Sequence, residues 1–370
     1  MKTESNHTIL LIYEGRLGSS RADSTYVLEN ARYFSQFLPT SIWNSRRKGW
    51  NVPDAIKVAF PIVSFGRAFN PKTLISSILH QLLFGLNIRR RVKVLTKSQA
   101  GQIVLVFHDW WPLIPLKFLG RKKKFLIVLE VHRSLPKLLI NLRTFSHIDL
   151  FIATNKLKFN ELLGYFKDKI VYERNAVGLS AYAKAQPFTS LPKLGRRSVL
   201  YTGSLGPEKN PDILLAISRA MPELDFYIVG CTPAAWESIK VPRNLSILGP
   251  KPHSDISGFQ LSADMLLVTL DPKDAQSSLY TSTMKLFEYM AAKRPIIAPE
   301  LHSVLEVLST DEFYAYQADD VGSLKTAIIL ASKELENPKL PSDEKLAAIS
   351  WEDRNQRIIS EIKRISNLRK

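Results

Sequence analysis

The chain has 370 residues, of which 45% are hydrophobic and 23% are charged, as in a soluble globular protein with room for two domains. Its single cysteine, Cys231, excludes an internal disulfide, argues against a thiolate metal site and fits a reducing cytosol. We expect neither a signal peptide nor a membrane span, because residues 9–13 are only strand-long and no apolar run reaches about 20 residues.

The net charge of +17 is confined to the first half of the chain. Residues 1–190 hold 29 Lys and Arg against 11 Asp and Glu, whereas the remainder holds 22 against 23. A solubilising charge spread evenly over the surface does not account for this asymmetry. It favours an anionic partner such as phospholipid headgroups, a lipid pyrophosphate or nucleic acid. No nucleic-acid-binding module is recognisable, so nucleic acid is not expected.

In chain order, residues 9–13 predict a buried strand, followed by a glycine-containing loop and a helix over about 24–37. This succession opens an α/β unit whose loop lies at the ligand-binding edge of the sheet. The loop lacks the G-x-G-x-x-G pattern of a dinucleotide site. A second helix is predicted over about 71–92, with an apolar face closed by Arg89, Arg90 and Arg91. That face either packs on a core or lies in a membrane interface beside its arginines.

Further strands are predicted at residues 103–107, 125–131 and 150–154. His108 and His132 directly follow the first two, which places them at the ligand edge of the sheet. The alternative for each is a helix-capping or solvated loop histidine. Residues 178–197 are polar, contain proline and lack periodicity, which indicates an interdomain linker.

A second α/β unit is predicted from residue 198, with strands at 198–201, 226–229, 245–248 and 265–268. Residues 281–298 predict a loop, a short helix and a buried strand. Lys285 and Glu288 lie one turn apart at the start of this helix, where backbone N–H groups also favour a phosphate. The alternative is an amphipathic helix with solvated Lys and Glu. A last helix is predicted over residues 350–369.

The segments STMKLFEYMAAKRPIIAPE, VLEVHRSLP and GSLGPEKN together resemble the GT-B-fold glycosyltransferases, in particular the retaining family 4 type. The resemblance implies an α/β fold with two Rossmann-like domains facing a cleft. Residues 1–185 would bind the acceptor and residues 186–350 the nucleotide-sugar donor. Residues 351–370 would form a helix that packs back on the first domain.

The resemblance also implies a role for individual residues. Glu288 would accept hydrogen bonds from the donor ribose, Lys209 would bind the diphosphate, and His132 would contact the transferred sugar, so these three are the candidate catalytic residues. The other implied donor-binding residues are Gly203, Ser204, Lys251, Pro252, Thr283, Met284, Lys285 and Leu286. The acceptor side or cleft would include Gly15, Arg16, Gly18 and, as the weaker histidine candidate, His108.

Two positions depart from the family pattern. Ser204 stands where the family usually has an arginine, and Tyr280 stands where it usually has a glutamate. Either the chain is an inactive scaffold, or Lys285 supplies the missing positive charge, which we favour because Lys285 lies at the helix start.

The function that the resemblance implies is transfer of a sugar, with retention, from a UDP- or GDP-linked donor to a glycan or lipid-linked acceptor in surface polysaccharide or glycoconjugate biosynthesis. No Asp-x-Asp pair occurs, so we expect no metal and no other cofactor. The basic half predicts a cytoplasmic protein that is peripheral on the inner face of the cell membrane. A nucleotide-sugar epimerase and a non-catalytic GT-B binding protein remain alternatives.

Overall fold

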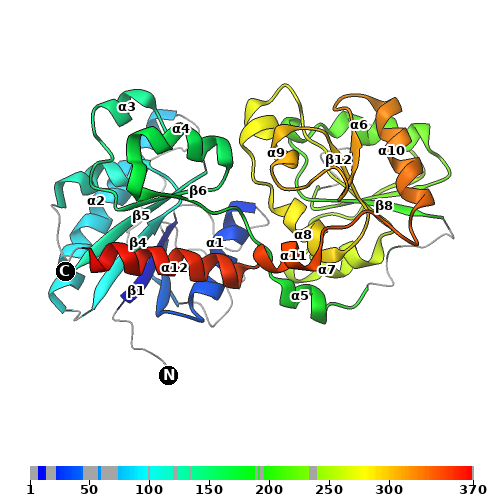
Figure 1. Ribbon diagram of the computed structural model, residues 1–370. Coiled ribbons are helices and arrows are strands. Elements are labelled where there is room, and N and C mark those ends of the chain that lie inside the picture. Colours follow the sequence, from blue (N-terminus) through cyan, green and yellow to red (C-terminus); the bar gives the residue numbers. More distant parts are fainter. Residues whose placement is uncertain are drawn as a thin grey trace. The chain divides into compact units, whose positions relative to one another are not determined.

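The structure is a computed structural model that describes residues 7–13, 22–44, 57–59, 74–98, 101–119, 124–132, 135–187, 191, 196–232 and 240–368. The chain divides into two compact units (Figure 1). The first comprises residues 1–19, 23–174 and 351–370, and the second comprises residues 20–22 and 175–350. The main segment of the first unit ends at Arg174, whereas the sequence predicted a domain that ends at residue 185. The C-terminal helix from Trp351 also belongs to the first unit.

The first unit contains a parallel sheet with the strand order β3-β2-β1-β4-β5-β6-β7. Its strands are β1 His7–Tyr13, β2 Thr40–Asn44, β3 Lys57–Ala59, β4 Gln102–Phe107, β5 Phe125–Val131, β6 Leu150–Ala153 and β7 Ile170–Tyr172. Helices cover both faces of the sheet, which is why β4 and β5 are mainly apolar rather than alternating, apart from Gln102 at the start of β4 and Glu130 within β5. The helices are α1 Ala22–Phe34, α2 Leu74–Ser98, α3 Lys137–Asn141, α4 Lys156–Phe166 and α12 Trp351–Asn367, with 3₁₀ helices at Trp111–Leu119 and Lys167–Lys169.

The second unit contains a parallel sheet with the strand order β10-β9-β8-β11-β12-β13. Its strands are β8 Ser198–Thr202, β9 Asp225–Val229, β10 Leu245–Ile247, β11 Met265–Leu267, β12 Ile296–Pro299 and β13 Tyr314–Tyr316. Its helices are α5 Leu179–Lys184, α6 Pro211–Ala220, α7 His253–Ser262, α8 Met284–Ala292, α9 His302–Leu305, α10 Val321–Lys333 and α11 Asp343–Ala348. A 3₁₀ helix at Pro207–Lys209 and a π-helix at Gln276–Tyr280 complete its described elements.

The strand order reverses once in each sheet, between β1 and β4 and between β8 and β11. Ligands of open parallel sheets bind outside the carboxyl ends of the strands at such a reversal. His108 follows β4 directly, and Gly203 follows β8 directly. The topology therefore places one candidate residue of each unit at the position where a ligand is expected.

The segment predicted as a linker is partly structured. Helix α5 lies within it, and Leu179 and Tyr182 pack against the core of the second unit. The Tyr182 hydroxyl also donates a hydrogen bond to Gln260 Oε1 at 2.6 Å. Composition alone concealed this helix, because its two anchoring side chains find their partners only in the tertiary fold. Among the described helices, none is both long and apolar enough to cross a membrane.

Candidate functional site

In the second unit, the site begins at the turn after β8. Gly203 has a φ of +125°, a conformation that side chains rarely adopt, and its N–H donates to the Val229 carbonyl at 2.7 Å. A Cβ at this position would lie 3.1 Å from Nζ of Lys285. Glycine is therefore needed both for the turn and for the close approach of the lysine. Ser204 is exposed, and its carbonyl accepts a hydrogen bond from the Tyr201 hydroxyl at 2.9 Å.

Lys285 is the second residue of α8, and its side chain is buried beside this turn. Its Nζ lies 3.6 Å from the centroid of the Tyr201 ring and has no hydrogen-bond partner among the described residues. Burial holds the pKa of Lys285 well below its usual value, and the positive charge of Lys209 lowers this pKa further. The carboxylates of Glu288 and Glu208 act in the opposite direction, but their effect is smaller. An ammonium group in this state is stabilised by any anion that reaches it.

Lys209 lies at the end of the 3₁₀ helix Pro207–Lys209. Burial lowers the pKa of its ammonium, and the carboxylates of Glu208 and Asp274 offset this in part. Its carbonyl accepts a hydrogen bond from Thr269 Oγ1 at 2.5 Å, which fixes the loop to the chain just after β11. The two lysines thus bring two partly desolvated positive charges to the carboxyl ends of β8 and β11.

The start of α8 adds backbone dipoles to these charges. Thr283, the residue before the helix, makes no side-chain hydrogen bond to the first turn. The backbone just before the helix is fixed by Asn175, whose side-chain amide donates a hydrogen bond to the Ser282 carbonyl. Uncapped N–H groups at a helix N-terminus carry partial positive charge and bind phosphate. Together with Lys209 and Lys285, they form a site suited to a diphosphate.

Glu288 lies one turn further along α8 and is half-buried. Its Oε2 accepts a hydrogen bond from Nε2 of Gln260 at 3.2 Å, and the same amide nitrogen donates to Thr202 Oγ1 at 3.1 Å. Gln260 therefore fixes the carboxylate relative to the end of β8. A fixed carboxylate acceptor can bind a pair of ribose hydroxyl groups. Sequence reasoning missed Gln260 because it lies on α7, outside the segments that carried the resemblance.

The remaining predicted donor residues fall into two groups. Met284 and Leu286 lie in the first turn of α8 next to Lys285, and the Leu286 side chain belongs to the core. Lys251 and Pro252 are exposed before α7. Their loop is tied to β9, because the Gly249 carbonyl accepts a hydrogen bond from the Gly230 N–H at 2.9 Å.

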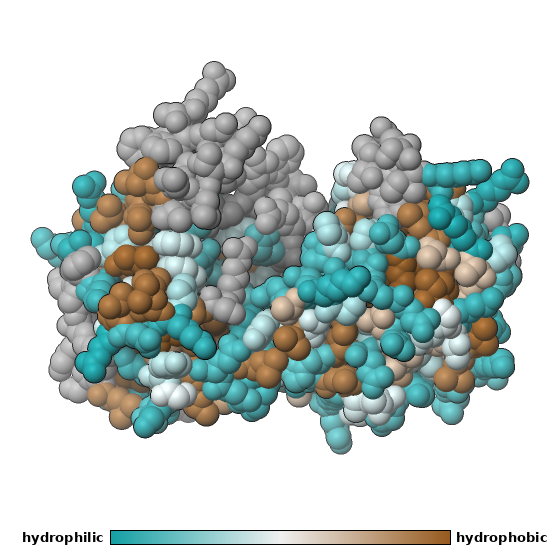
Figure 2. Space-filling view, turned by 90° about the horizontal axis from the view of Figure 1, so that it is seen from above, coloured by the Kyte–Doolittle hydropathy of each residue, from teal (hydrophilic) through white to brown (hydrophobic). Residues whose placement is uncertain are grey.

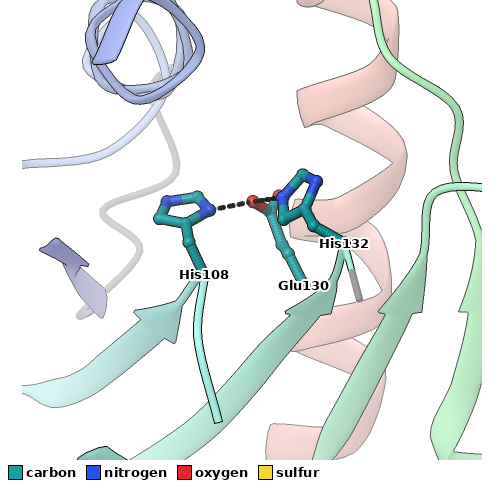
Figure 3. A group of neighbouring side chains, drawn as sticks. All are labelled: His108, Glu130 and His132. Atoms are coloured by element: carbon teal, nitrogen blue, oxygen red, sulfur yellow. Dashed lines mark ion pairs between the residues drawn. The ribbon is translucent and has the colours of Figure 1, made fainter. Parts of the chain in front are cut away.

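In the first unit, two imidazoles flank one buried carboxylate (Figure 3). His108 Nδ1 lies 2.6 Å from Oε2 of Glu130, and His132 Nε2 lies 3.7 Å from the same oxygen. The rings of both histidines also contact Tyr26 of α1 edge-on. The structure thus brings the two candidate histidines together and adds Glu130, which the sequence analysis did not single out. The signal for it was a charged residue within the otherwise apolar strand FLIVLEV.

Glu130 is ionised in this setting. Burial by itself raises the pKa of its carboxyl, but His108 and the guanidinium of Arg354 outweigh burial and hold the pKa well below its usual value. Burial lowers the pKa of His132, although its contact with Glu130 acts in the opposite direction. His132 is therefore neutral at neutral pH.

The ligand atoms of His108, Glu130 and His132 all lie within 4.8 Å of one another, a spacing that would admit a metal ion. The surrounding charges oppose one. Arg354 lies 2.9 Å from Oε1 of Glu130, and the ammonium of Lys158 donates to the His132 carbonyl at 2.6 Å. We therefore interpret the group as a cluster of charged and polar groups around Glu130. The predicted cleft residues Gly15, Arg16 and Gly18 lie outside the described residues.

Residues 196–333, which carry Gly203, Lys209 and α8, match the model of the family described as Glycosyl transferases group 1. No curated protein sequence matches the chain. Among solved structures, a glycosyltransferase from Rickettsia africae ESF-5 is similar over 97% of this chain and 98% of its own, with a TM-score of 0.71 and 15% identity.

Two further solved structures share the architecture. Sucrose-phosphate synthase from Thermosynechococcus elongatus is similar over 98% of this chain and 100% of its own, with a TM-score of 0.71 and 13% identity. HepE from Anabaena, solved in complex with UDP, is similar over 96% and 99%, with a TM-score of 0.68 and 13% identity.

These findings show the GT-B fold over nearly the whole chain, as the resemblance in sequence predicted. The glycosyltransferase family model matches residues 196–333, which lie within the second unit. The finer assignment to the retaining family 4 type stays a prediction.

Proposed function

We propose that this chain transfers a sugar from a nucleotide-sugar donor, and that the second unit binds the donor. The observation that carries the proposal is a pair of lysines, the half-buried Lys209 and the buried Lys285, beside the uncapped start of α8. Negative charge grows on the leaving diphosphate as the glycosidic bond breaks, so fixed positive charges placed there stabilise the transition state. HepE, which shares the fold, has been solved with UDP and with UDP-glucose.

In this proposal, Glu288 binds the donor ribose, and the loop of Lys251 and Pro252 lies beside the base. Lys285 replaces the arginine that is absent at Ser204, because its ammonium reaches the Gly203 turn directly before that residue. The two lysines and the helix start take the place of a divalent ion. Retention of configuration and a UDP- or GDP-linked donor are the finer parts of the proposal.

Thermal unfolding in the presence of UDP, GDP and ADP tests the donor site. A ligand that binds the folded chain at a hundred times its Kd adds about 2.7 kcal/mol of stability. We expect one diphosphate to raise the Tm with EDTA present, and Lys209→Ala and Glu288→Ala to abolish the rise. Lys325→Ala, an exposed position on α10, is the matched control. If no diphosphate stabilises the chain, the alternative of a non-catalytic GT-B scaffold is favoured instead.

For the acceptor, we propose a glycan or a lipid-linked intermediate at the inner face of the cell membrane, in surface polysaccharide or glycoconjugate biosynthesis. This function requires an acceptor, which separates it from a nucleotide-sugar epimerase on the same fold. Product formation from donor alone, with the sugar epimerised, would favour the epimerase.

Helix α2 supports contact with an anionic membrane. It contains no Asp or Glu, and apolar residues reach the described surface of the first unit between hydrophilic ones (Figure 2). Leu79, Leu86 and Val94 are 38%, 40% and 67% exposed. At 100° per residue, they share one face of the helix with the exposed cations Arg90 and Lys97. A face of this kind lies in a membrane interface with its cations at the headgroups.

Co-sedimentation with liposomes tests this contact. We expect binding to vesicles that contain anionic lipid, weaker binding to neutral vesicles, and loss of binding in the pair Arg90→Ala and Lys97→Ala. The pair Lys325→Ala and Lys333→Ala on α10 of the second unit is the control. Equal binding to neutral and anionic vesicles, or no effect of the α2 substitutions, would refute the membrane contact while leaving the donor site untouched.

A further inference from the structure

Glu130 is completely buried in β5, and each of its carboxylate oxygens contacts different groups. Oε1 lies 2.9 Å from the guanidinium of Arg354 and accepts a hydrogen bond from the Asn30 side chain at 3.3 Å. Oε2 is the atom between the two histidines. The carboxylate thus connects helix α12, which supplies Arg354, to the two side chains at the ligand edge of the sheet.

The contact between Oε1 of Glu130 and Arg354 keeps the carboxylate ionised, and this restricts which groups can contact Oε2. A guanidinium carries only donors and stays charged, so Glu130 remains an acceptor-only carboxylate. A ring nitrogen within hydrogen-bond distance of Oε2 must then carry the proton. This condition applies to Nδ1 of His108, at 2.6 Å, whereas Nε2 of His132, at 3.7 Å, lies beyond hydrogen-bond distance.

A neutral imidazole has one protonated and one unprotonated nitrogen, and a partner of one nitrogen decides which form is present. If Nδ1 of His108 donates to Glu130, its Nε2 is left as an acceptor. That Nε2 is buried and has no hydrogen-bond partner among the described residues. An acceptor nitrogen left unpaired at the ligand edge of a sheet is complementary to a hydroxyl group of a ligand, not to a phosphate oxygen.

We propose that Glu130, held by Arg354, fixes the tautomer of His108 so that its Nε2 presents an unprotonated nitrogen to a sugar hydroxyl. Glu130 and Arg354 are positioning residues in this arrangement, and the imidazole of His108 is the group that touches the ligand. The hydroxyl-binding role rests on the proposed function. The tautomer itself is a property of the ligand-free protein and is measurable without any substrate.

The decisive measurement is a long-range ¹H–¹⁵N correlation spectrum of the ligand-free full chain labelled at histidine, at pH 7.5. His108→Gln and His132→Gln assign the two signals among the seven histidines of the chain. We expect His108 to be neutral and protonated at Nδ1. Protonation of His108 at Nε2 alone, or an imidazolium at His108, would overturn the proposal.

Substitutions of Glu130 and Arg354 distinguish a role in positioning the imidazole of His108 from a purely structural role. Glu130→Gln removes the obligate acceptor, so the His108 signal should move towards a mixture of tautomers. Arg354→Lys keeps the charge beside Glu130 and should preserve the wild-type tautomer. An unchanged His108 tautomer in Glu130→Gln would show that Glu130 does not set it. If Glu130→Gln fails to fold, the wild-type spectrum still decides the proposal.

Failure of this inference and failure of the proposed function are distinguishable. Glu130→Gln leaves the second unit unchanged, so it should retain the stabilisation by a nucleoside diphosphate. A wrong tautomer combined with intact diphosphate binding overturns only the inference about Glu130. The correct tautomer combined with no diphosphate binding overturns the donor site, and it leaves Glu130 as a positioning residue for a hydroxyl ligand of another kind.

Discussion

The guanidinium of Arg354 lies 2.9 Å from the carboxylate of Glu130, and both side chains are almost completely buried. The two residues are 224 positions apart in the sequence. Arg354 also donates to the Tyr26 hydroxyl at 2.6 Å and, through Nε, to the Arg174 carbonyl at 2.8 Å. Helix α12 is therefore bound to the first unit by a charge pair at the same edge of the sheet as His108 and His132.

Substitution of Arg354 by Met should destabilise the chain strongly. It removes the cation and leaves the buried carboxylate of Glu130 unpaired, which costs about 3–5 kcal/mol in comparable cases. The measurement is the free energy of unfolding of the first unit in urea. Arg357→Met on the same helix is the control, because Arg357 pairs with Glu173 at a position where its side chain is 48% exposed, and such pairs contribute about 1 kcal/mol or less. Equal losses in the two variants would contradict the role given to the buried pair.

His147 should make the first unit sensitive to mild acid. Burial lowers its pKa to about 4, and backbone groups of Leu113 and Thr144 offset burial only in part. In the unfolded chain, a histidine titrates near pH 6.5. As the pH falls below about 6.5, the unfolded state therefore gains a proton that the folded state does not bind, and stability decreases down to about pH 4.

The expected loss is about 2 kcal/mol between pH 6.5 and pH 5, since each pH unit contributes about 1.4 kcal/mol. Urea unfolding at several pH values measures it. His147→Gln should flatten this dependence, whereas His302→Gln at an exposed position should not. A wild-type profile that is flat between pH 6.5 and pH 5 would show that His147 is solvated or protonated in the folded chain.

Strands β4 and β5 and the short helix α8 could be predicted from the sequence because their signals are local, whereas β2, β3 and β13 were not predicted. Strands β4 and β5 are buried on both faces, so each is an apolar run, and α8 is a short apolar stripe followed by Pro295. The position of Lys285 at the start of α8 follows from spacing alone. Its contact with Gly203 does not, because 82 positions separate the two residues and no periodicity links them.

The role of Glu130 could not be predicted for a related reason. A glutamate within an apolar strand signals a buried carboxylate, but it does not reveal the partner, which here is an arginine on the last helix. Helix α5 was missed because a hexamer with two apolar anchors resembles a linker until its packing partners are known. Pairings between distant segments are what local patterns do not encode.

Gly203→Ala should impair both the turn and the diphosphate site. The positive φ costs about 1–3 kcal/mol with a side chain present, and the new Cβ would lie 3.1 Å from the Lys285 ammonium. We expect a lower Tm and at least tenfold weaker binding of the nucleoside diphosphate. Gly164→Ala is the control, since a Cβ at that position in α4 meets nothing within 4 Å and should leave both properties intact or raise the Tm. Undiminished diphosphate binding by Gly203→Ala would place the phosphates away from this turn.

Binding of a nucleoside diphosphate should be accompanied by proton uptake at Lys285. In the free protein, burial and the charge of Lys209 hold the pKa of Lys285 well below its usual value, opposed by Glu288 and Glu208. An anion beside the ammonium favours its charged form and raises the pKa. The protonated protein therefore binds more tightly, and affinity should fall as the pH rises above the pKa of the free protein, by up to tenfold per pH unit.

Calorimetric titrations above pH 7, where the ligand phosphates are already ionised, measure this linkage. The binding enthalpy should depend on the ionisation enthalpy of the buffer and correspond to uptake of up to one proton per ligand. Lys285→Arg keeps a positive charge that does not titrate. It should therefore bind the diphosphate with much less proton uptake and a flatter pH dependence, whereas Lys325→Ala should behave as the wild type. A binding enthalpy that is the same in all buffers would mean that Lys285 is already charged in the free protein. The ammonium would then be stabilised by solvent or by a contact other than those around Tyr201.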